Sequence, residues 1–328
     1  MDAAQPLVSI VTPFYNSEAF LAECIRSVVG QTYENFEYIL LDNCSTDGST
    51  AIAREFAARD SRIKVHRNPQ LIPQVPNYNT ALRLISASSR YVKIVQADDW
   101  LFPECVERMV ALAVAHPRIG IVSSYSLWGV NIDGVGLPHG LDVMSGRDIC
   151  RRQLIHGGFW FGSPTVVMYR ADIVRSRDPF FSEGRLHEDT EACYEILRSE
   201  DFGFVHQLLS YMRFDNESIS QRVRDFNPNA LDRLIVVVRY GPDFLTADEQ
   251  ERVLQRAERN YYRYLGRSAL RFRGSKFWAY HREGLKTIGR GLPWLRLVPG
   301  AVLDLVDMAL NPKRTLENAI ATLRGPST

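Results

Sequence analysis

Two adjacent carboxylates, Asp98 and Asp99, directly follow an apolar run of the sequence. Carboxylates placed side by side at a buried strand end repel each other, and that repulsion costs stability unless a cation neutralises it. Hard divalent cations prefer such oxygen ligands and often share them with a diphosphate. A cap for the helix that follows is the plainer explanation. We favour a divalent-metal site, because a cap does not require two carboxylates.

A second acidic pair, Glu188 and Asp189, opens a segment with helical spacing. Acidic residues in the first turn of a helix favour its positive end, which accounts for one of the two carboxylates. A positioned carboxylate also serves as a general base that removes the proton of an attacking hydroxyl. The neighbouring His187 is a further candidate for that role.

A third polar segment runs from Asp42 to Ser49 and is rich in Asp, Asn, Ser and Gly. These residues favour a turn with a helix N-cap, so the segment alone is equally consistent with structure and function. Its position is more informative, since this segment, Thr12–Asn16 and Gln96–Asp99 each follow an apolar run. In a parallel α/β sheet, ligands bind beyond the carboxyl ends of the strands. We therefore expect the three segments to converge on one edge.

The elements that position these segments alternate in type from Leu7 to about Val122. Short runs rich in β-branched residues predict strands, at 7–12, 36–41, 62–66, 91–95 and 119–123. Between them, apolar residues recur at helical spacing, at 18–29, 49–59, 77–87 and 103–115. Such alternation is typical of βαβ units, so we predict an α/β fold with a mostly parallel sheet and helices on both faces.

After about Gly129 the alternation is less regular. SGRD at 145–148 has the form of a capping box, residues 159–174 contain a predicted strand, 186–199 a helix and 205–214 a last strand. From about residue 225 the sequence is rich in Arg and Leu with helical spacing. We predict a main domain over 1–224, with halves at about 1–122 and 123–224, and a helical C-terminal region over 225–328.

Four motifs in order resemble the family 2 inverting glycosyltransferases of the GT-A fold. They are SIVTPFYN, LDNCSTDGS, QADDW and HEDTE, and their order and spacing match over roughly residues 6–220. The resemblance implies transfer of a sugar from a nucleoside-diphosphate sugar, with UDP-sugars favoured, to a hydroxyl of a saccharide or lipid-linked glycan. It also implies inversion at the anomeric carbon and a role in polysaccharide or cell-envelope glycan synthesis.

The resemblance implies roles for individual residues. Thr12, Tyr15, Asp42, Asn43, Asn79 and Asp98 would bind the donor, and Asp99 would be the direct ligand of Mn²⁺ or Mg²⁺. Asp189, the second residue of its pair, would be the general base, with Glu188 beside the acceptor. Metal bound at Asp99 would assist departure of the diphosphate as a Lewis acid.

The sequence departs from the family pattern at three positions. Asn43 stands where many members have a second Asp, Tyr78 where an Arg or Lys is common, and Asp215 where a His is usual. Asn offers both donor and acceptor groups where Asp offers only acceptors, which leaves the nucleobase open. The departures also motivate an alternative function, a nucleotide-sugar-binding relative without turnover.

Two further residues are candidates for ligand contacts. Trp160 lies among glycines and aromatic residues, and its ring is either a platform for the acceptor sugar or part of the core. Arg213 opens a segment that resembles the closing motif of the family and is a candidate diphosphate contact.

Composition excludes several other classes. The formal net charge is +1, so the overall charge gives no indication of a nucleic-acid partner. No glycine-rich or basic loop follows the first strand, which disfavours sugar-phosphate nucleotidyltransferases, dinucleotide oxidoreductases and P-loop enzymes. The five widely spaced cysteines form no disulfide or zinc pattern, and the N-terminus lacks a basic region before its apolar run. We expect a cytoplasmic protein.

The segment at 291–310 is apolar and has the basic neighbours Lys286, Arg290 and Arg296. Helices packed on the main domain are the plainer prediction. An amphipathic segment that brings the enzyme peripherally to a membrane, and so to a lipid-linked acceptor, is the alternative. No run reaches the roughly 20 apolar residues that a membrane span needs.

Overall fold

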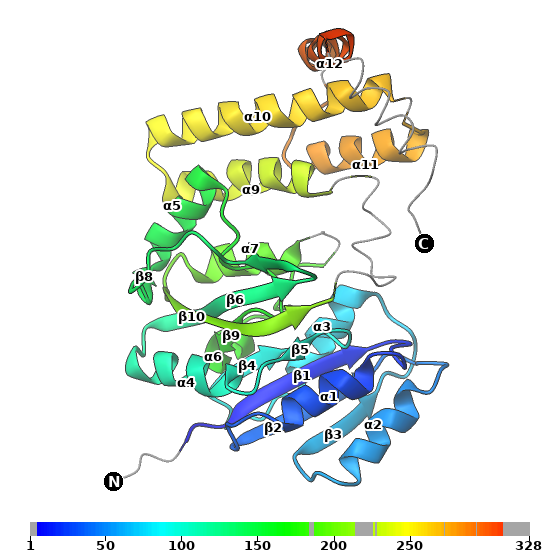
Figure 1. Cartoon of the computed structure of the whole chain (residues 1–328), viewed down its shortest axis with the longest axis vertical. Helices are drawn as coiled ribbons and strands as arrows, with labels where there is room; N and C mark the ends of the chain where they lie inside the picture. The colour runs from blue at the N-terminus through cyan, green and yellow to red at the C-terminus, as the bar shows by residue number, and fades with distance from the viewer. Residues whose placement is uncertain are drawn as a thin grey trace. The chain divides into compact units, whose positions relative to one another are not determined.

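The apolar runs of the N-terminal part form strands of one mixed sheet (Figure 1). The computed structural model describes residues 5–183, 187–213, 226, 228–271, 273–292 and 294–310. Among these residues the sheet has ten strands in the order β3-β2-β1-β4-β9-β6-β10-β5, with β7 beside β6 and β8 beside β10. The bounds are β1 (Val8–Phe14), β2 (Phe36–Asp42), β3 (Ile63–Arg67), β4 (Tyr91–Ile94), β5 (Trp100–Leu101), β6 (Ile119–Trp128), β7 (Asn131–Asp133), β8 (Val143–Ser145), β9 (Met168–Arg170) and β10 (Asp201–Met212).

The long ladders of the sheet are parallel. β1 pairs in parallel with β2 and β4, β2 with β3, and β6 with β10. The predicted α/β class with a mostly parallel sheet is confirmed. The short strand β9 lies antiparallel between β4 and β6. β9 is the strand predicted within 159–174. The sequence does not indicate its antiparallel place in the sheet, because a local pattern does not specify which strands pair.

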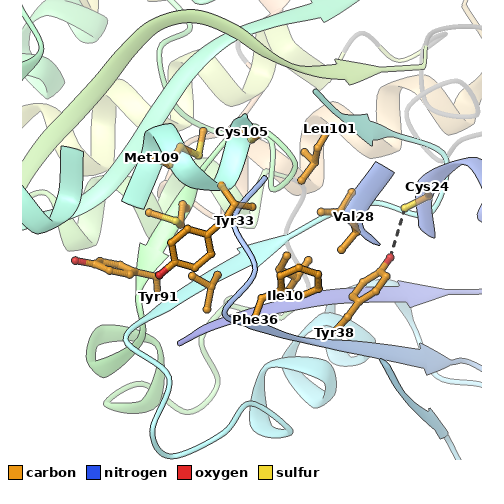
Figure 2. Packing of buried hydrophobic residues seen from close by; sticks show 14 of the residues in the cluster. Ile10, Cys24, Val28, Tyr33, Phe36, Tyr38, Tyr91, Leu101, Cys105 and Met109 are labelled. Atoms are coloured by element: carbon orange, nitrogen blue, oxygen red, sulfur yellow. Dashed lines mark hydrogen bonds between the residues drawn. The ribbon is translucent and has the colours of Figure 1, made fainter. Parts of the chain in front are cut away.

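Helices cover the sheet, at α1 (Leu21–Val29), α2 (Ser49–Ala57), α3 (Gln74–Arg83), α4 (Cys105–Ala115), α5 (Gly146–His156), α6 (Ala171–Arg175) and α7 (Glu188–Ile196). Alternate residues of the central strands, among them Ile10 and Tyr38, pack against apolar residues of α1 and α4 (Figure 2). Val11 and Ile39 are also buried but point to the other face, and α3 packs on β1 and β2. Burial on both faces explains why these strands are almost wholly apolar.

The C-terminal residues form helices, as predicted. They are α9 (Pro228–Phe244), α10 (Ala247–Leu270), α11 (Ser275–Lys286), the 3₁₀ helix η2 (Trp294–Leu297) and α12 (Val298–Leu310). The chain divides into two compact units, Met1–Asn216 and Glu217–Thr328. The boundary predicted between residues 224 and 225 lies outside the described residues, as does Asp215. Among the helices that the structure describes, none is long and apolar enough to cross a bilayer.

Candidate active site

The polar segments that follow β1 and β2 are joined by hydrogen bonds at one edge of the sheet. The backbone amide of Asn43 donates to the Phe14 carbonyl at 2.8 Å, and the backbone amide of Asn16 donates to Ser45 Oγ at 3.1 Å. The Thr46 amide donates to Asn16 Oδ1 at 2.8 Å. β4, which leads to Asp98 and Asp99, is parallel to β1 on its other side. The structure thus brings the three predicted segments to the same edge.

Asp42 is fully buried and organises the turn that follows β2. Its Oδ1 accepts a hydrogen bond from the Ser45 amide at 2.7 Å. Its Oδ2 accepts from Thr50 Oγ1 and from Arg67 Nη1, each at 2.8 Å. A contact between this carboxylate and a donor nucleotide would add to three existing hydrogen bonds.

Asn43 closes a neighbouring loop. Its Oδ1 accepts from Asn68 Nδ2 at 2.9 Å and from the Ile72 amide at 3.1 Å, while its Nδ2 donates to the Ile72 carbonyl at 2.8 Å. A carboxylate could not make the last of these bonds, because it has no hydrogen to donate. Asn43, which stands where many family members have Asp, therefore makes a hydrogen bond that an Asp could not make.

Thr12 and Tyr15 differ sharply in exposure. Thr12 is fully buried, and its hydroxyl lies 2.9 Å from the Tyr38 hydroxyl. Tyr15 has 45% of its surface exposed and lies at the edge itself. Of the two side chains, only that of Tyr15 is available to a ligand.

Asp99 is buried and held from two sides. Its Oδ2 accepts from Thr165 Oγ1 at 2.6 Å, and its Oδ1 accepts from the Arg213 amide at 3.0 Å. Burial raises the pKa of the Asp99 carboxyl, and the adjacent charge of Asp98 raises it further. Two neighbouring carboxylates that oppose each other's ionisation form a place where a cation would be stabilised.

The second acidic pair lies at the first turn of α7, after His187 in a left-handed conformation with φ of 69°. Burial raises the pKa of Glu188 to about 7, and the charge of Asp189 contributes. Asp189 Oδ1 accepts from the Thr190 amide at 2.6 Å. Burial lowers the pKa of His187, which makes its imidazole a weaker base than an exposed one.

Tyr78 is buried and hydrogen-bonded to two glutamine side chains. Its hydroxyl accepts hydrogen bonds from Gln96 Nε2 at 3.0 Å and Gln74 Nε2 at 3.3 Å. Burial raises the pKa of Tyr78, and the charges of both Asp98 and Glu188 raise it further. The charges of Asp98 and Glu188 therefore both favour the neutral form of the Tyr78 hydroxyl.

Comparison with known proteins decides the family. The model of the glycosyl transferase family 2 matches residues 9–177, which is more than half of the chain. The chain belongs to glycosyl transferase family 2. The matched range includes the Asp98–Asp99 pair and Thr165, and it ends before α7 and Arg213.

Individual relatives of this family 2 glycosyltransferase agree with that assignment. The chain is 26% identical over 220 residues to the putative teichuronic acid biosynthesis glycosyltransferase TuaG of Bacillus subtilis, covering 66% of this chain and 82% of TuaG. Among solved structures, S. aureus TarS 1–349 in complex with UDP-GlcNAc has a TM-score of 0.62 at 18% identity, covering 88% of this chain and 82% of that one. The mannosyltransferase PcManGT from Pyrobaculum calidifontis, in complex with GDP-Man and Mn²⁺, has a TM-score of 0.56 at 16% identity, covering 95% and 83%. These likenesses confirm the GT-A fold.

In this family 2 glycosyltransferase, the carboxylates of Asp98 and Asp99 fit a divalent cation that a bound ligand would also coordinate. Among the described residues, no group of three or more His, Cys, Asp or Glu is placed to hold an ion. Asp99, with Asp98 beside it, offers the carboxylate oxygens that would fit such a cation. Mg²⁺ is commonly bound in this way, through one or two carboxylates and the phosphates of a substrate.

Two residues beyond those predicted from the sequence, Lys93 and Thr165, hold Asp99 in place. Lys93 is fully buried, and its ammonium donates to the carbonyls of Thr165 and Val167. Thr165 Oγ1 accepts a hydrogen bond from the backbone amide of Gln96 at 3.1 Å and donates one to Asp99. Burial lowers the pKa of Lys93 to about 8. A lysine inside the otherwise apolar run YVKIV is the signal that could have indicated this network.

Asn79, predicted to bind the donor, contacts the backbone instead. Its Nδ2 donates to the Phe181 carbonyl and its Oδ1 accepts from the Phe181 amide, each at 2.9 Å. Both ends of the amide are therefore engaged with the segment that leads towards α7. The structure gives Asn79 a positioning contact, and its predicted contact with the donor stays a prediction.

Trp160, the candidate acceptor platform, is only 5% exposed. Its indole N–H donates to the Val135 carbonyl at 2.9 Å, and Gly158 packs against its ring. The neighbouring Phe159 is 48% exposed. The ring that this segment offers to solvent is that of Phe159.

Arg213 lies against the metal motif. Its Nε donates to the Asp98 carbonyl at 3.1 Å, and its Nη2 pairs with Glu23 at the start of α1. Its guanidinium carbon lies 4.6 Å from the ring centroid of Phe20. The residues that follow, including Ser218 and Ser220 of the resembled closing motif, lie outside the described residues.

Proposed function

We propose that this family 2 glycosyltransferase moves a sugar from a nucleoside-diphosphate sugar, with UDP-sugars favoured, to a hydroxyl of a saccharide or lipid-linked glycan. The observation that carries the proposal is that the segments after β1, β2 and β4, with the buried Asp99 among them, meet at one edge of the sheet in a chain that belongs to this family. A donor held at this edge would, in this proposal, have its sugar within reach of a carboxylate of α7. TarS in complex with UDP-GlcNAc and PcManGT with GDP-Man support the donor class.

The proposed reaction is a single displacement with inversion. The acceptor oxygen forms a bond to the anomeric carbon as the bond from that carbon to the diphosphate oxygen breaks. Asp189 accepts the proton of the acceptor hydroxyl, and the nucleoside diphosphate leaves. Glu188 would lie beside the acceptor, and burial raises its pKa to about 7.

The remaining residues bind and orient. Tyr15 offers an exposed ring at the edge where the nucleotide would lie, and Asp42 and Asn43 hold the turns around it. Asp99 would bind Mn²⁺ or Mg²⁺ directly, with Thr165 and Lys93 fixing its orientation. When bound, such a cation would neutralise the diphosphate leaving group. Arg213, whose Nε donates to the Asp98 carbonyl, is the residue that we propose contacts the diphosphate.

Two observations support a cytoplasmic reaction in a polysaccharide or cell-envelope pathway. TuaG carries teichuronic acid biosynthesis in its name, which favours a polysaccharide or cell-envelope pathway. The five cysteines are free, which is usual in a reducing compartment such as the cytoplasm.

Thermal unfolding with UDP, GDP, dTDP and CDP, each with and without Mn²⁺, tests the donor site. A nucleotide that binds only the folded state raises the melting temperature. We expect a metal-dependent rise with one nucleotide, and its loss in Asp99→Ala. Turnover of the matching sugar donor should fall by at least about a thousandfold in Asp189→Asn, with donor binding kept.

The same experiment distinguishes turnover from binding alone. Donor binding with no effect of Asp189→Asn on any rate would support a non-catalytic relative. No binding and no turnover across a broad donor panel would overturn the proposal.

A further inference from the structure

The last two helical elements that the structure describes, η2 and α12, expose several apolar side chains. Seven apolar side chains between 294 and 310 are each between 47% and 87% exposed, namely Trp294, Leu295, Val298, Val302, Leu305, Val306 and Leu310. Within α12 these residues recur at spacings of three, four and seven, so they share one face of the helix. We call these seven residues the apolar face.

The opposite side of α12 packs on α10. A Cβ atom added at Gly300 would lie 2.7 Å from the Cα of Arg263, so the two helices approach closely at this point. Gly300 lies two residues from both Val298 and Val302, and therefore about half a turn away from the apolar face. Figure 1 shows α12 on the side of α10 that faces away from α9 and α11. The apolar face is thus directed away from the helix that supports α12.

The two units of the chain carry opposite charge. Residues 217–328 contain 19 Lys and Arg against 12 Asp and Glu, whereas residues 1–216 contain 20 against 26. The net charge of +1 for the whole chain conceals this separation. The unit that exposes the apolar face is therefore also the basic one.

Part of the basic charge is arranged along α10, beside α12. Arg252, Arg256, Arg259 and Arg263 are exposed and recur at spacings of four, three and four, so they form a stripe along one side of the helix. The backbone of Arg263, at the end of the stripe, is the place where Gly300 makes its close approach. We call these four residues the arginine stripe.

We propose that the apolar face and the arginine stripe together dock on the surface of an anionic lipid bilayer. Exposed apolar surface of this kind marks sites of protein or membrane association. An amphipathic helix with basic neighbours lies in the plane of a membrane interface, with its apolar side chains among the acyl chains. Anionic headgroups attract clustered Lys and Arg within about one Debye length.

Charge favours the bilayer over a second copy of the chain. Two basic units brought together at their apolar faces would repel each other, whereas an anionic surface complements them. The apolar face also favours a bilayer over nucleic acid, since phosphate recognition uses the arginines and leaves Val302 and Leu305 without a role. The inference is independent of the proposed reaction, because it uses no residue of the donor site.

Co-sedimentation with lipid vesicles tests the proposal. Full-length protein is mixed with vesicles of pure phosphatidylcholine, or of phosphatidylcholine with 30% phosphatidylglycerol. We expect at least tenfold stronger binding to the anionic vesicles, and weaker binding as salt is raised. Replacing the arginine stripe with Gln should weaken binding about fivefold for each arginine that reaches the surface.

The apolar face is tested by the double variant Val302→Asp with Leu305→Asp. We expect at least a tenfold loss of binding to anionic vesicles, with unchanged far-UV circular dichroism because both side chains are exposed. Val130→Asp is the matched control, since Val130 is 93% exposed and belongs to the other unit. It should bind vesicles like the parent protein.

Three results would overturn the proposal. The first is binding that does not distinguish anionic from neutral vesicles, or no binding at all. The second is anionic binding that the Val302→Asp with Leu305→Asp variant leaves unchanged, which would make the surface purely electrostatic. The third is self-association in sedimentation velocity that this variant abolishes, which would assign the apolar face to a second copy.

Discussion

At the scale of single residues, the orientation of Asp99 depends on Thr165. The threonine hydroxyl donates to Asp99 Oδ2, and its own backbone carbonyl is fixed by Lys93. Groups that orient a metal ligand typically contribute 10- to 100-fold to metal affinity. We therefore expect Thr165→Val, which keeps the shape and removes the hydroxyl, to weaken Mn²⁺ binding in the presence of UDP by about 10- to 100-fold.

The measurement is isothermal titration of Mn²⁺ into the UDP-saturated protein. Thr165→Ser is the matched control, because it keeps the hydroxyl, and it should bind within about twofold of the parent. Unchanged Mn²⁺ affinity in Thr165→Val would contradict the prediction, and equal loss in the Ser and Val variants would mean that the packing of the whole side chain, rather than the hydrogen bond alone, matters at this position.

Glu188 should make stability depend on pH. Its pKa is raised in the folded protein from 4.5 to about 7, so the folded state holds more protons than the unfolded state between these values. The free energy of unfolding should therefore fall as pH rises from about 4.5 to 7. Glu188→Gln removes this titration, so the variant should be more stable than the parent above pH 7, with the difference vanishing below about pH 4.5.

Urea unfolding at several pH values, without metal or nucleotide, measures this difference. At about 1.4 kcal/mol per pKa unit its upper limit is near 3 kcal/mol, and partial exposure of the carboxylate lowers it. Asp99 titrates in both proteins, so its effect on the free energy of unfolding cancels in the difference between them. Parallel stability curves for the two proteins would show that the α7 terminus does not hold Glu188 in its neutral form.

At the scale of elements, α3 positions the segment that leads towards α7. Asn79 on α3 makes two hydrogen bonds to the Phe181 backbone. Asn79→Ala leaves two buried backbone groups unsatisfied, and we expect a loss of about 1–3 kcal/mol in the free energy of unfolding. Arg83→Gln on the same helix removes an exposed ion pair with Asp178 and should cost less than about 1 kcal/mol.

Turnover separates a positioning role from a merely stabilising one. If Asn79 places the α7 carboxylates, Asn79→Ala should lower kcat more than it raises KM for the donor, at a temperature where the variant is fully folded. A rise in donor KM with kcat unchanged would instead favour the direct donor contact that the resemblance implies.

The alternation of strands and helices could be predicted from the sequence because most elements are long enough to show their period. β1 and β2 are apolar throughout, and their ends place the polar segments after them. β9 has three residues, and its antiparallel insertion between β4 and β6 leaves no local pattern. The topology of that part of the sheet therefore required the structure.

Candidate site residues could be proposed from the sequence, but their contacts could not. Asp98, Asp99, Glu188 and Asp189 stand out because they lie in motifs that resemble those of the family, QADDW and HEDTE. The contacts of Asn43, Asn79 and Trp160 depend on partners that are distant in the sequence, and each is engaged with backbone groups. Thr165 is separated from Asp99 by 66 positions, so no spacing rule could connect them.

At the scale of the whole molecule, the two proposals concern different units of the chain. The residues proposed to bind the donor lie in residues 1–216, and the apolar face and the arginine stripe lie in residues 217–328. Hydrogen exchange can report both in one protein, because bound ligands slow local opening where they bind. The expected maps are therefore distinct.

With UDP and Mn²⁺, we expect slower exchange at Tyr15–Glu18, Asp42–Thr50 and Gln96–Trp100, and no change from α9 to α12. With anionic vesicles, we expect slower exchange in η2 and α12 and no change at those three segments. At about 100 times the dissociation constant, a bound nucleotide stabilises the folded state by about 2.7 kcal/mol, which is large enough to be measured in this way. Protection of α12 by the nucleotide would contradict the separation, because it would mean that donor binding reaches the surface we assign to the bilayer.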